Sequence, residues 1–368
     1  MLRGEKMGDF KYLSIVEWAK NYINENHMRE GDRFLSEKEL CDIHGVSRQT
    51  VRQALMTLEN DNILTKRRGS GTFVGSASAP APAVSQGCMV GVISTYFSDY
   101  IFPGIVTGIE KVLRENDIAM QMAITHNRVS DETRALKTML SQDVKGLIIE
   151  PSKSALPNPN MKLYEKIGEM NIPVVFFNAK YPWSDFPCVA IDDEAAGRVA
   201  TEYLWKTGHR KISGIFTLDD IQGHKRYSGY MQTLISHNSS DAEHDVLWFA
   251  TNERKTLFET SEKRILKLIY DSTAIVCYND NIAVSLLNFC RKHGIRVPDD
   301  LSIVGIDNSK LSRICEVPLT TVTHPHQLLG EAAAKKLIDA MNGAPLKGND
   351  TLFAPELMIR SSTRPLTR

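Results

Sequence analysis

The sequence predicts a multidomain protein, α+β near its amino terminus and α/β over the rest of the chain. The chain has 368 residues, 42% hydrophobic and 24% charged, with no net charge. This is a globular composition, long enough for two or three domains. Residues 75–86 read GSASAPAPAVSQ, a small, uncharged stretch without periodicity. Beyond it, apolar strand-like runs alternate with amphipathic helical stretches, which is typical of parallel sheets covered on both faces.

These observations divide the chain into three parts. We expect a small domain over residues 8–75, a flexible linker over residues 76–87 and a large domain over residues 88–368. A linker is expected because a stretch of small residues cannot bury enough surface to offset its ordering entropy. The large domain should have two α/β lobes, since ten or more strands exceed one convenient open sheet.

The small domain should begin with three helices. An apolar stripe indicates the first helix through Ile15, Ala19, Tyr22 and Ile23. A second helix should follow Ser36, which forms a capping box with Glu39, and should stop at Gly45, a residue suited to a left-handed turn. A third helix should start at Ser47, another good cap, and run to about Asn60.

Two features predict that this domain reads DNA. Arg48 and Arg52 lie one turn apart on the third helix, opposite its apolar face, and two short helices around a glycine turn are typical of a helix-turn-helix. The basic glycine turn at residues 66–71 joins two short apolar runs and should form a wing beside this helix. Arginine can read guanine and glutamine can read adenine, whereas the wing suits phosphate or minor-groove contact. The alternative is a small helical domain whose arginines are merely solvated.

The same residues resemble the GntR-type winged helix over residues 10–74. The resemblance is carried by Leu35-Ser-Glu-Lys-Glu-Leu40, Gly45-Val-Ser-Arg-Gln-Thr-Val-Arg-Gln-Ala-Leu55 and Gly69-Ser-Gly-Thr-Phe-Val74. Leu35 stands where that family usually has proline. With the pattern above, the resemblance implies operator-DNA contacts at Lys11, Glu37, Ser47, Arg48, Gln49, Thr50, Arg52, Arg68, Gly69 and Gly71.

The large domain should bind a small molecule in the cleft between its lobes, at the carboxyl ends of its strands. Apolar runs predict strands at residues 90–93, 120–123, 146–149, 174–177, 189–191, 211–216, 274–278 and 303–306. Polar and aromatic side chains follow these runs or lie near them, and we predict effector contacts from Tyr96, Tyr100, Glu150, Asn178, Asp193, Arg226, Asn279, Asp307 and His326.

This set suits a sugar. Carboxylates, amides and arginine can bond vicinal hydroxyls in pairs, and aromatic faces suit the C–H face of a sugar ring. Each residue also has a plainer interpretation: Asp192, Asp193 and Asp280 could be helix caps, the tyrosines could be core residues, and Arg226 could lie at the surface. The residue chemistry by itself indicates only a polyhydroxy ligand.

The large domain resembles the ligand-binding domain of the LacI/GalR family, which has a periplasmic-binding-protein-like fold, over Met89–Thr363. The matching stretches are Thr207-Gly-His-Arg-Lys-Ile212, Arg226-Tyr-Ser-Gly-Tyr230, Tyr278-Asn-Asp280, Val297-Pro-Asp-Asp-Leu-Ser-Ile-Val-Gly-Ile-Asp307, Pro318-Leu-Thr-Thr-Val322 and Arg360-Ser-Ser-Thr363. The family's ligand contacts fall on Arg226, Asn279 and Asp307. No LacI-type reading head precedes Met89, and the fusion with a GntR-type head instead resembles the bacterial arabinose repressors, which implies L-arabinose as effector.

The sequence therefore predicts a transcription repressor that leaves double-stranded operator DNA when sugar binds. We expect a cytoplasmic homodimer with no cofactor and no membrane segment, since no apolar run reaches the ~20 residues of a membrane span. The six scattered cysteines favour reduced thiols. Three alternatives remain open: a different pentose or hexose as effector, a sugar-transport protein, and a sugar-processing enzyme. No known catalytic motif favours the enzyme, and the histidine pair at residues 324 and 326 has no evident third metal ligand.

Overall fold

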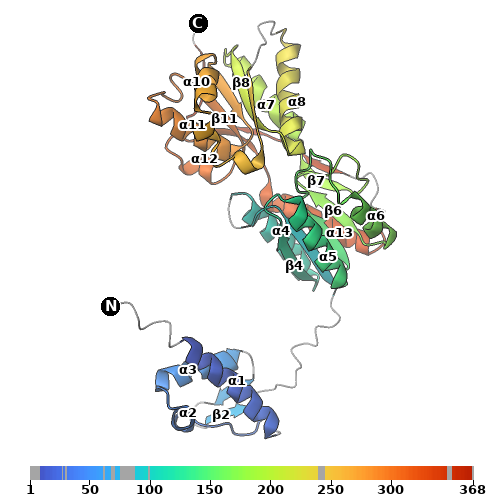
Figure 1. Cartoon of the computed structure of the whole chain (residues 1–368), viewed down its shortest axis with the longest axis vertical. Coiled ribbons are helices and arrows are strands. Elements are labelled where there is room, and N and C mark those ends of the chain that lie inside the picture. Colours follow the sequence, from blue (N-terminus) through green and yellow to red (C-terminus); the bar gives the residue numbers. More distant parts are fainter. Residues whose placement is uncertain are drawn as a thin grey trace. The chain divides into compact units, whose positions relative to one another are not determined.

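The structure is a computed structural model that describes residues 9–26, 28–29, 31–60, 63–67, 71–74, 88–97, 100–238, 245–345 and 350–366. Contacts divide the chain into two compact units, Met1–Gly87 and Cys88–Arg368 (Figure 1). The predicted linker and the wing residues Arg68 and Gly69 lie outside the described residues. Lys11 belongs to the first helix, but its side chain is likewise outside the described part.

The described residues of the smaller unit form three helices and a hairpin. Their bounds are α1 (Asp9–Glu25), α2 (Glu37–His44), α3 (Arg48–Asn60), β1 (Leu64–Arg67) and β2 (Gly71–Val74). The two strands pair antiparallel, with Leu64 opposite Val74. An isolated antiparallel β-bridge between Arg33 and Phe73 connects the segment before α2 to the hairpin. The order of elements is that of a winged helix-turn-helix.

Local hydrogen bonds fix both ends of α2 and the start of α3. The Ser36 side chain accepts from the Glu39 backbone N–H (3.3 Å), and the Glu39 carboxylate accepts from the Ser36 backbone N–H (2.7 Å). Gly45 has a left-handed backbone with φ of 62°. The Ser47 hydroxyl accepts from the Thr50 backbone N–H at 3.3 Å. The predicted capping box, glycine turn and serine cap are therefore confirmed.

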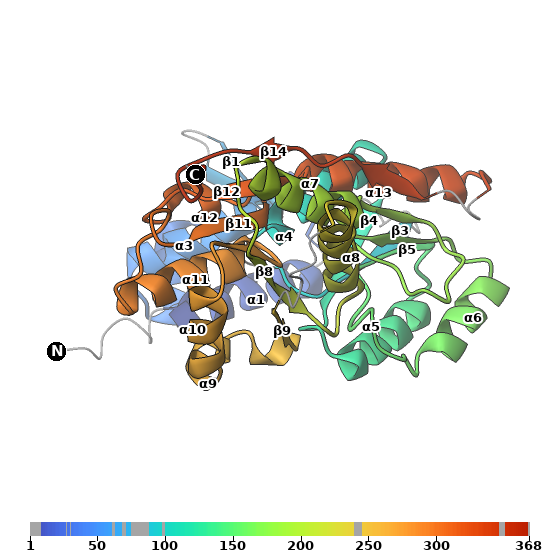
Figure 2. The ribbon, with the colours of Figure 1, turned by 90° about the horizontal axis from the view of Figure 1, so that it is seen from above.

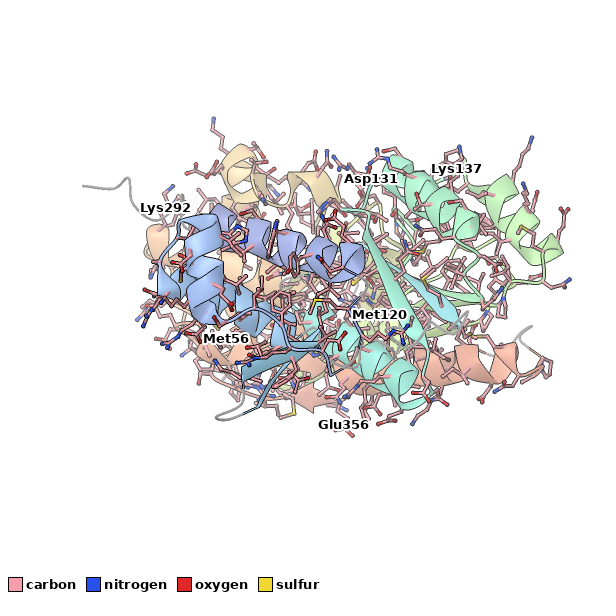
Figure 3. The ribbon with its side chains drawn as sticks, turned by 90° about the horizontal axis from the view of Figure 1, so that it is seen from below. Met56, Met120, Asp131, Lys137, Lys292 and Glu356 are labelled. Carbon is pink, nitrogen blue, oxygen red and sulfur yellow. The ribbon has the colours of Figure 1, made fainter. Side chains whose placement is uncertain are left out.

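Helix α3 has one buried and one exposed face, as its sequence predicts. The buried residues pack into the core of the small unit and are Val51, Ala54, Leu55 and Leu58. Arg48, Gln49 and Arg52 are exposed on the other side. Met56 is also 63% exposed and projects from the outside of this helix (Figure 3).

The larger unit has two lobes, each built on a six-stranded sheet. The first sheet has the order β13-β7-β6-β5-β3-β4, and every neighbouring pair in it is parallel. Its strands are β3 (Met89–Ser94), β4 (Ala119–Ile124), β5 (Gly146–Ile149), β6 (Val174–Phe177), β7 (Cys188–Ile191) and β13 (Thr351–Phe353). Helices α4 (Phe102–Glu115) and α13 (His326–Met341) cover one face, and α5 (Val129–Ser141) and α6 (Met161–Glu169) cover the other.

The second sheet has the order β14-β12-β11-β10-β8-β9, with β14 antiparallel. Its strands are β8 (Ile212–Thr217), β9 (Val246–Phe249), β10 (Ala274–Cys277), β11 (Ser302–Asp307), β12 (Thr320–Thr323) and β14 (Leu357–Met358). One face packs against α7 (Asp193–Lys206) and α8 (Ile221–Ser236), and the other against α10 (Glu262–Tyr270) and α11 (Asp280–Lys292). The short elements are η1 (Thr251–Glu253), α9 (Leu257–Thr260) and α12 (Leu311–Ile314). Figure 2 shows α6 and α10 at opposite ends of the unit.

The chain passes between the lobes at three places: after β7, after β12 and between β13 and β14. Lobe 1 is the lobe built on the first sheet, and lobe 2 is the lobe built on the second. Helix α13, near the carboxyl end of the chain, therefore belongs to lobe 1, where it packs against α4. The carboxyl ends of the parallel strands of both lobes face the cleft between them. This arrangement confirms the predicted two-lobed parallel-sheet architecture and places the predicted site at the cleft.

Candidate effector pocket and nucleic-acid interface

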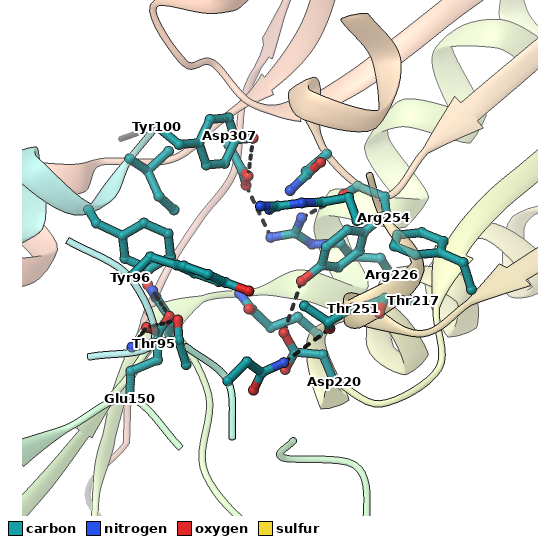
Figure 4. A pocket seen from close by; sticks show the side chains of 18 residues that line it. Thr95, Tyr96, Tyr100, Glu150, Thr217, Asp220, Arg226, Thr251, Arg254 and Asp307 are labelled. Carbon is teal, nitrogen blue, oxygen red and sulfur yellow. Dashed lines mark hydrogen bonds and ion pairs between the residues drawn. The ribbon is translucent and has the colours of Figure 1, made fainter. Parts of the chain in front are cut away.

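A pocket of about 610 Å³, its mouth included, lies in the cleft and draws its lining from both lobes (Figure 4). Seven of the nine predicted effector residues line it, namely Tyr96, Tyr100, Glu150, Asn178, Arg226, Asn279 and Asp307. Asp193 and His326 are not in the lining, but each contacts a residue that is.

Arg226, on α8, organises the lobe 2 side of the pocket. Its Nε donates to Asp193 Oδ1 (2.8 Å) and its Nη2 donates to Asp307 Oδ1 (3.1 Å). Its Nη1 donates to the Tyr278 carbonyl oxygen at 2.6 Å. Arg226 is only 1% exposed, so it is not the surface residue of the alternative interpretation. Burial lowers the pKa of Arg226, but the carboxylates of Asp307 and Asp193 outweigh burial and raise that pKa above its usual value.

A close helix contact brings Arg226 to its partners. A methyl group at Gly197 of α7 would lie 1.9 Å from the Arg226 carbonyl oxygen. Only glycine therefore allows α7 and α8 to pack this closely. Asp193, at the start of α7, consequently reaches the guanidinium. Burial raises the pKa of Asp193 to about 6, although Arg226 opposes this shift.

Tyr100 crosses the cleft from lobe 1. Its hydroxyl donates to Asp307 Oδ2 (2.5 Å) and accepts from the Asp280 backbone N–H (3.1 Å). Its φ of 66° is unusual for a residue other than glycine and is the kind of strain that concentrates at functional sites. Tyr100 also packs against the lobe 1 core, so it is a core neighbour and a pocket residue at once.

Glu150 forms the lobe 1 wall with its neighbours. It accepts hydrogen bonds from the Thr95 backbone N–H (2.9 Å) and from Asn178 Nδ2 (2.7 Å). Burial raises the pKa of Glu150 to about 7, although the bonds from Thr95 and Asn178 oppose this shift. Asn178 Oδ1 is buried and has no hydrogen-bond partner within the described residues. It is therefore an acceptor that a ligand hydroxyl could satisfy.

The capping interpretation holds for some residues that follow strands. Asp192 accepts from the Ala195 backbone N–H (2.9 Å) and caps α7. Asn279 accepts from the Ile282 backbone N–H (3.1 Å) and caps α11, while also lining the pocket. Asp193 and Asp280 are not caps. Asp280 instead accepts from the Thr321 hydroxyl (2.6 Å) and the Ser309 backbone N–H (2.7 Å).

His324 lies in the connection between β12 and α13, and His326, the histidine predicted to contact the effector, begins α13. His326 Nε2 bonds the Asp307 carbonyl oxygen at 2.9 Å, and the ring of His326 stacks on that of His324. Burial lowers the pKa of both histidines. Throughout the described part of the chain, no group of three or more His, Cys, Asp or Glu residues could hold a metal ion. The six cysteines are free.

Sequence reasoning missed several lining residues, chiefly Asn127, Asp220, Gln222, Thr251, Arg254 and Tyr278. Asp220 follows β8 by three residues, and Tyr278 directly follows β10, so strand ends were the available signal. Thr251 and Arg254 follow β9, a strand that the sequence analysis did not predict. Arg254 lies over the Tyr96 ring of the other lobe, 5.4 Å from its centroid, a cation–π geometry.

In the smaller unit, Glu37 joins the predicted DNA-reading helix to the wing. Its carboxylate accepts from Arg52 Nε (3.0 Å) and from Lys66 Nζ (3.0 Å). Within the described part of the smaller unit, Glu37 contacts Arg52 through Nε, which leaves the two terminal nitrogens of that guanidinium for a planar bidentate contact. The hydrogen bond from Lys66 lowers the pKa of Glu37, although burial opposes this shift.

Comparisons with known proteins bear on both units. Residues 11–74 match the bacterial regulatory proteins of the gntR family, and residues 201–363 match the periplasmic binding protein-like domain. An arabinose metabolism transcriptional repressor of Geobacillus stearothermophilus is 39% identical over 97% of this chain and 98% of its own length. A repressor of the same name from Halalkalibacterium halodurans is 35% identical over 96% of each chain. The chain belongs to this repressor family.

Solved structures agree with this membership. The transcription regulator CcpA of Lactococcus lactis superimposes on the repressor with a TM-score of 0.67 and 27% identity, covering 76% of this chain and all of that one. The resemblance to GntR-type heads, to LacI/GalR-type sensors and to arabinose repressors is thereby confirmed. No helix in the described ranges of the repressor is long and apolar enough to cross a membrane.

Proposed function

We propose that this repressor controls arabinose-utilisation genes, and that L-arabinose in the cleft of the larger unit releases it from operator DNA. The observation that carries the proposal is the Arg226 cluster: a buried guanidinium fixed by two carboxylates, facing tyrosines and amides, in a chain that also has a winged head. The relatives named for arabinose metabolism support the choice of sugar.

The pocket offers complementary groups to a polyhydroxy ring. Arg226 has five N–H groups, and the described residues accept hydrogen bonds from three of them, which leaves two for ligand hydroxyls. Asn178 Oδ1 supplies an acceptor, and the faces of Tyr96 and Phe102 supply apolar surface. The two predicted residues outside the lining have supporting roles in this proposal. Asp193 would hold Arg226 in place, and His326 would hold Asp307 in place.

Release would follow from closure of the lobes. A sugar bonded to groups of both lobes favours their closed arrangement, and a coupling of about 1–3 kcal/mol between sugar and DNA is typical of such regulators. We further propose a cytoplasmic homodimer whose paired heads read two half-sites. The chemistry requires no cofactor and no catalytic step. On DNA, Arg48, Gln49 and Arg52 would meet bases, while Ser47, Thr50, Lys11, Arg68, Gly69 and Gly71 would lie nearer the backbone.

Titration calorimetry on the full chain tests the sugar assignment. We expect micromolar binding of L-arabinose and at least tenfold weaker binding of D-xylose, D-ribose and D-galactose, since one mispaired hydroxyl leaves a buried polar group unsatisfied. A gel shift with promoter DNA of the arabinose genes tests release. If another sugar both binds more tightly and frees the DNA, the effector is that sugar. Turnover of any sugar would support the enzyme alternative.

A further inference from the structure

A turn of lobe 1 bridges the cleft away from Arg226 and Asp307. Arg226 and Asp307 lie near the connections between the lobes, because they bond Asp193 and His326, each of which begins a helix just after one of those connections. At the other end of the pocket, the turn after β5 meets the loop after β8 (Figure 4 shows Asp220 and Thr251 there). None of the residues at this end was predicted from the sequence.

Ser154 makes a close contact between the two lobes. Its hydroxyl donates to Asp220 Oδ1 (2.5 Å) and accepts from the Ile221 backbone N–H (3.0 Å). The Ala155 backbone N–H donates to the Asp219 carbonyl oxygen (3.4 Å), and Lys153 Nζ lies 3.6 Å from Asp219 Oδ2. Ser154 is fully buried. These four contacts join protein atoms only, so they need no ligand in order to form.

Each half of this bridge is held by hydrogen bonds within its own lobe. On lobe 1, the buried carboxylate of Glu132 accepts from the Ser152 backbone N–H (2.6 Å), and Asn127 Oδ1 accepts from that of Lys153 (2.7 Å). On lobe 2, Asp219 Oδ1 accepts from the Thr251 backbone N–H (3.0 Å) and hydroxyl (2.7 Å).

Backbone strain marks the same place. His126, Asn127 and Lys153 all have positive φ, between 48° and 54°, although none is glycine. Strain of this kind persists only where the surroundings over-determine it. It presents the Lys153–Ser154 turn to the other lobe in one fixed conformation, held ready to bond.

We propose that Lys153 and Ser154, with Asp219 and Asp220, form a gate that must break before a ligand can enter or leave the pocket. The gate sets the exchange rate of the effector more than its affinity, because its bonds join protein atoms and none of them is made to the ligand. Neither Lys153 nor Ser154 lines the pocket, so they are positioning residues rather than ligand contacts. This inference rests on the proposed sugar-binding function.

The rates of sugar binding and release separate a gate from a contact. Weakening a gate speeds association and dissociation by similar factors and leaves Kd nearly unchanged. Losing a contact with the sugar speeds dissociation alone and raises Kd by the same factor. A residue with a merely structural role would not speed association.

The experiment compares Ser154→Ala with the wild-type full chain, using stopped-flow tryptophan fluorescence for the rates and calorimetry for Kd. Exchange of ¹³C-labelled L-arabinose, followed by NMR, gives the same rates independently. We expect both rates to rise about tenfold and Kd to change less than threefold, since a buried hydrogen bond to a carboxylate contributes on that order. Ser141→Ala, an exposed serine of the same lobe, is the matched control.

If Ser154→Ala does not fold, Lys153→Gln serves as the second test variant. Its ion pair is longer and about one-third exposed, so both rates should rise only about twofold, whereas Lys162→Gln should change neither. Unchanged rates, or faster dissociation with unchanged association, would overturn the gate. If the wild-type chain binds no sugar at all, the proposed function fails rather than the gate; if it prefers another sugar, the same comparison is made with that sugar.

Discussion

Two clusters that pair basic side chains with carboxylates stand in opposite surroundings. In the smaller unit, Arg52 and Lys66 share Glu37, and the Arg52 side chain is 65% exposed. In the larger unit, Arg226 is shared by Asp193 and Asp307, and all three side chains are at most 3% exposed. The bond lengths are nearly equal, from 2.8 to 3.1 Å.

The difference in burial gives the two clusters different tasks. An exposed ion pair contributes little, about 0–1 kcal/mol, so Arg52 can exchange Glu37 for a base or phosphate at small cost. A buried charge left without its partner costs several kcal/mol, so Arg226 cannot leave its carboxylates and instead forms a fixed wall for a ligand. The Arg52 cluster can therefore rearrange at small cost, whereas the Arg226 cluster stays fixed.

The largest effect should come from breaking the buried cluster. Arg226→Met leaves Asp193 and Asp307 buried without their cation, and we expect the larger unit to lose about 3–5 kcal/mol of unfolding free energy. Urea denaturation measures this loss. Arg264→Met breaks an exposed pair with Asp245 and should cost less than about 1 kcal/mol. Equal losses in the two variants would contradict the contrast between buried and exposed pairs.

A pH titration should reveal Glu150, the buried carboxyl group on the lobe 1 wall of the pocket. The pKa of Glu150 rises from 4.5 to about 7 on folding. Because the folded form keeps its proton longer, this group makes stability fall as the pH rises from about 4.5 to about 7, on the order of 3 kcal/mol in all. Glu150→Gln should remove that part of the slope in urea denaturation series at several pH values. Glu165→Gln, on exposed α6 surface, should leave the slope intact.

Removing the exposed arginine should affect DNA binding but not stability. Arg52→Ala should weaken specific DNA binding by about 10–100-fold, as expected for a bidentate base contact, and should change the free energy of unfolding by less than about 0.5 kcal/mol. Fluorescence anisotropy with operator and random DNA measures the first, and sugar binding should stay intact. Arg134→Ala, on exposed α5 surface, is the control. A drop in stability would mean that Arg52 is structural.

The smallest effect should come from the third member of the exposed cluster. If Lys66 leaves Glu37 for a phosphate, Lys66→Gln should lower the slope of log K against log salt by about 0.9 and weaken all DNA sequences alike. If Lys66 instead stays with Glu37, the slope will not change. Binding measured at four salt concentrations distinguishes these outcomes.

Prediction from sequence worked best where short-range patterns control structure. The capping box at Ser36, the turn at Gly45 and the apolar face of α3 all depend on residues within one or two turns of each other. The buried parallel strands were also found, since they are continuous apolar runs. The strands β9, β12, β13 and β14 were missed because they are short, edge-lying or rich in threonine.

The sequence by itself determined the two kinds of unit, the DNA-reading helix and the polar residues at the ends of strands, because periodicity and capping are local properties of the chain. Only the tertiary structure decided that Arg226 is held by Asp193 and Asp307, that Glu37 joins Arg52 to Lys66, and that Ser154 meets Asp220. These partners lie between 15 and 81 positions apart in the sequence, from the pair of residues 37 and 52 to the pair of residues 226 and 307. No local pattern encodes such pairings, because they depend on where the whole sheet places each strand end and on how closely its helices pack.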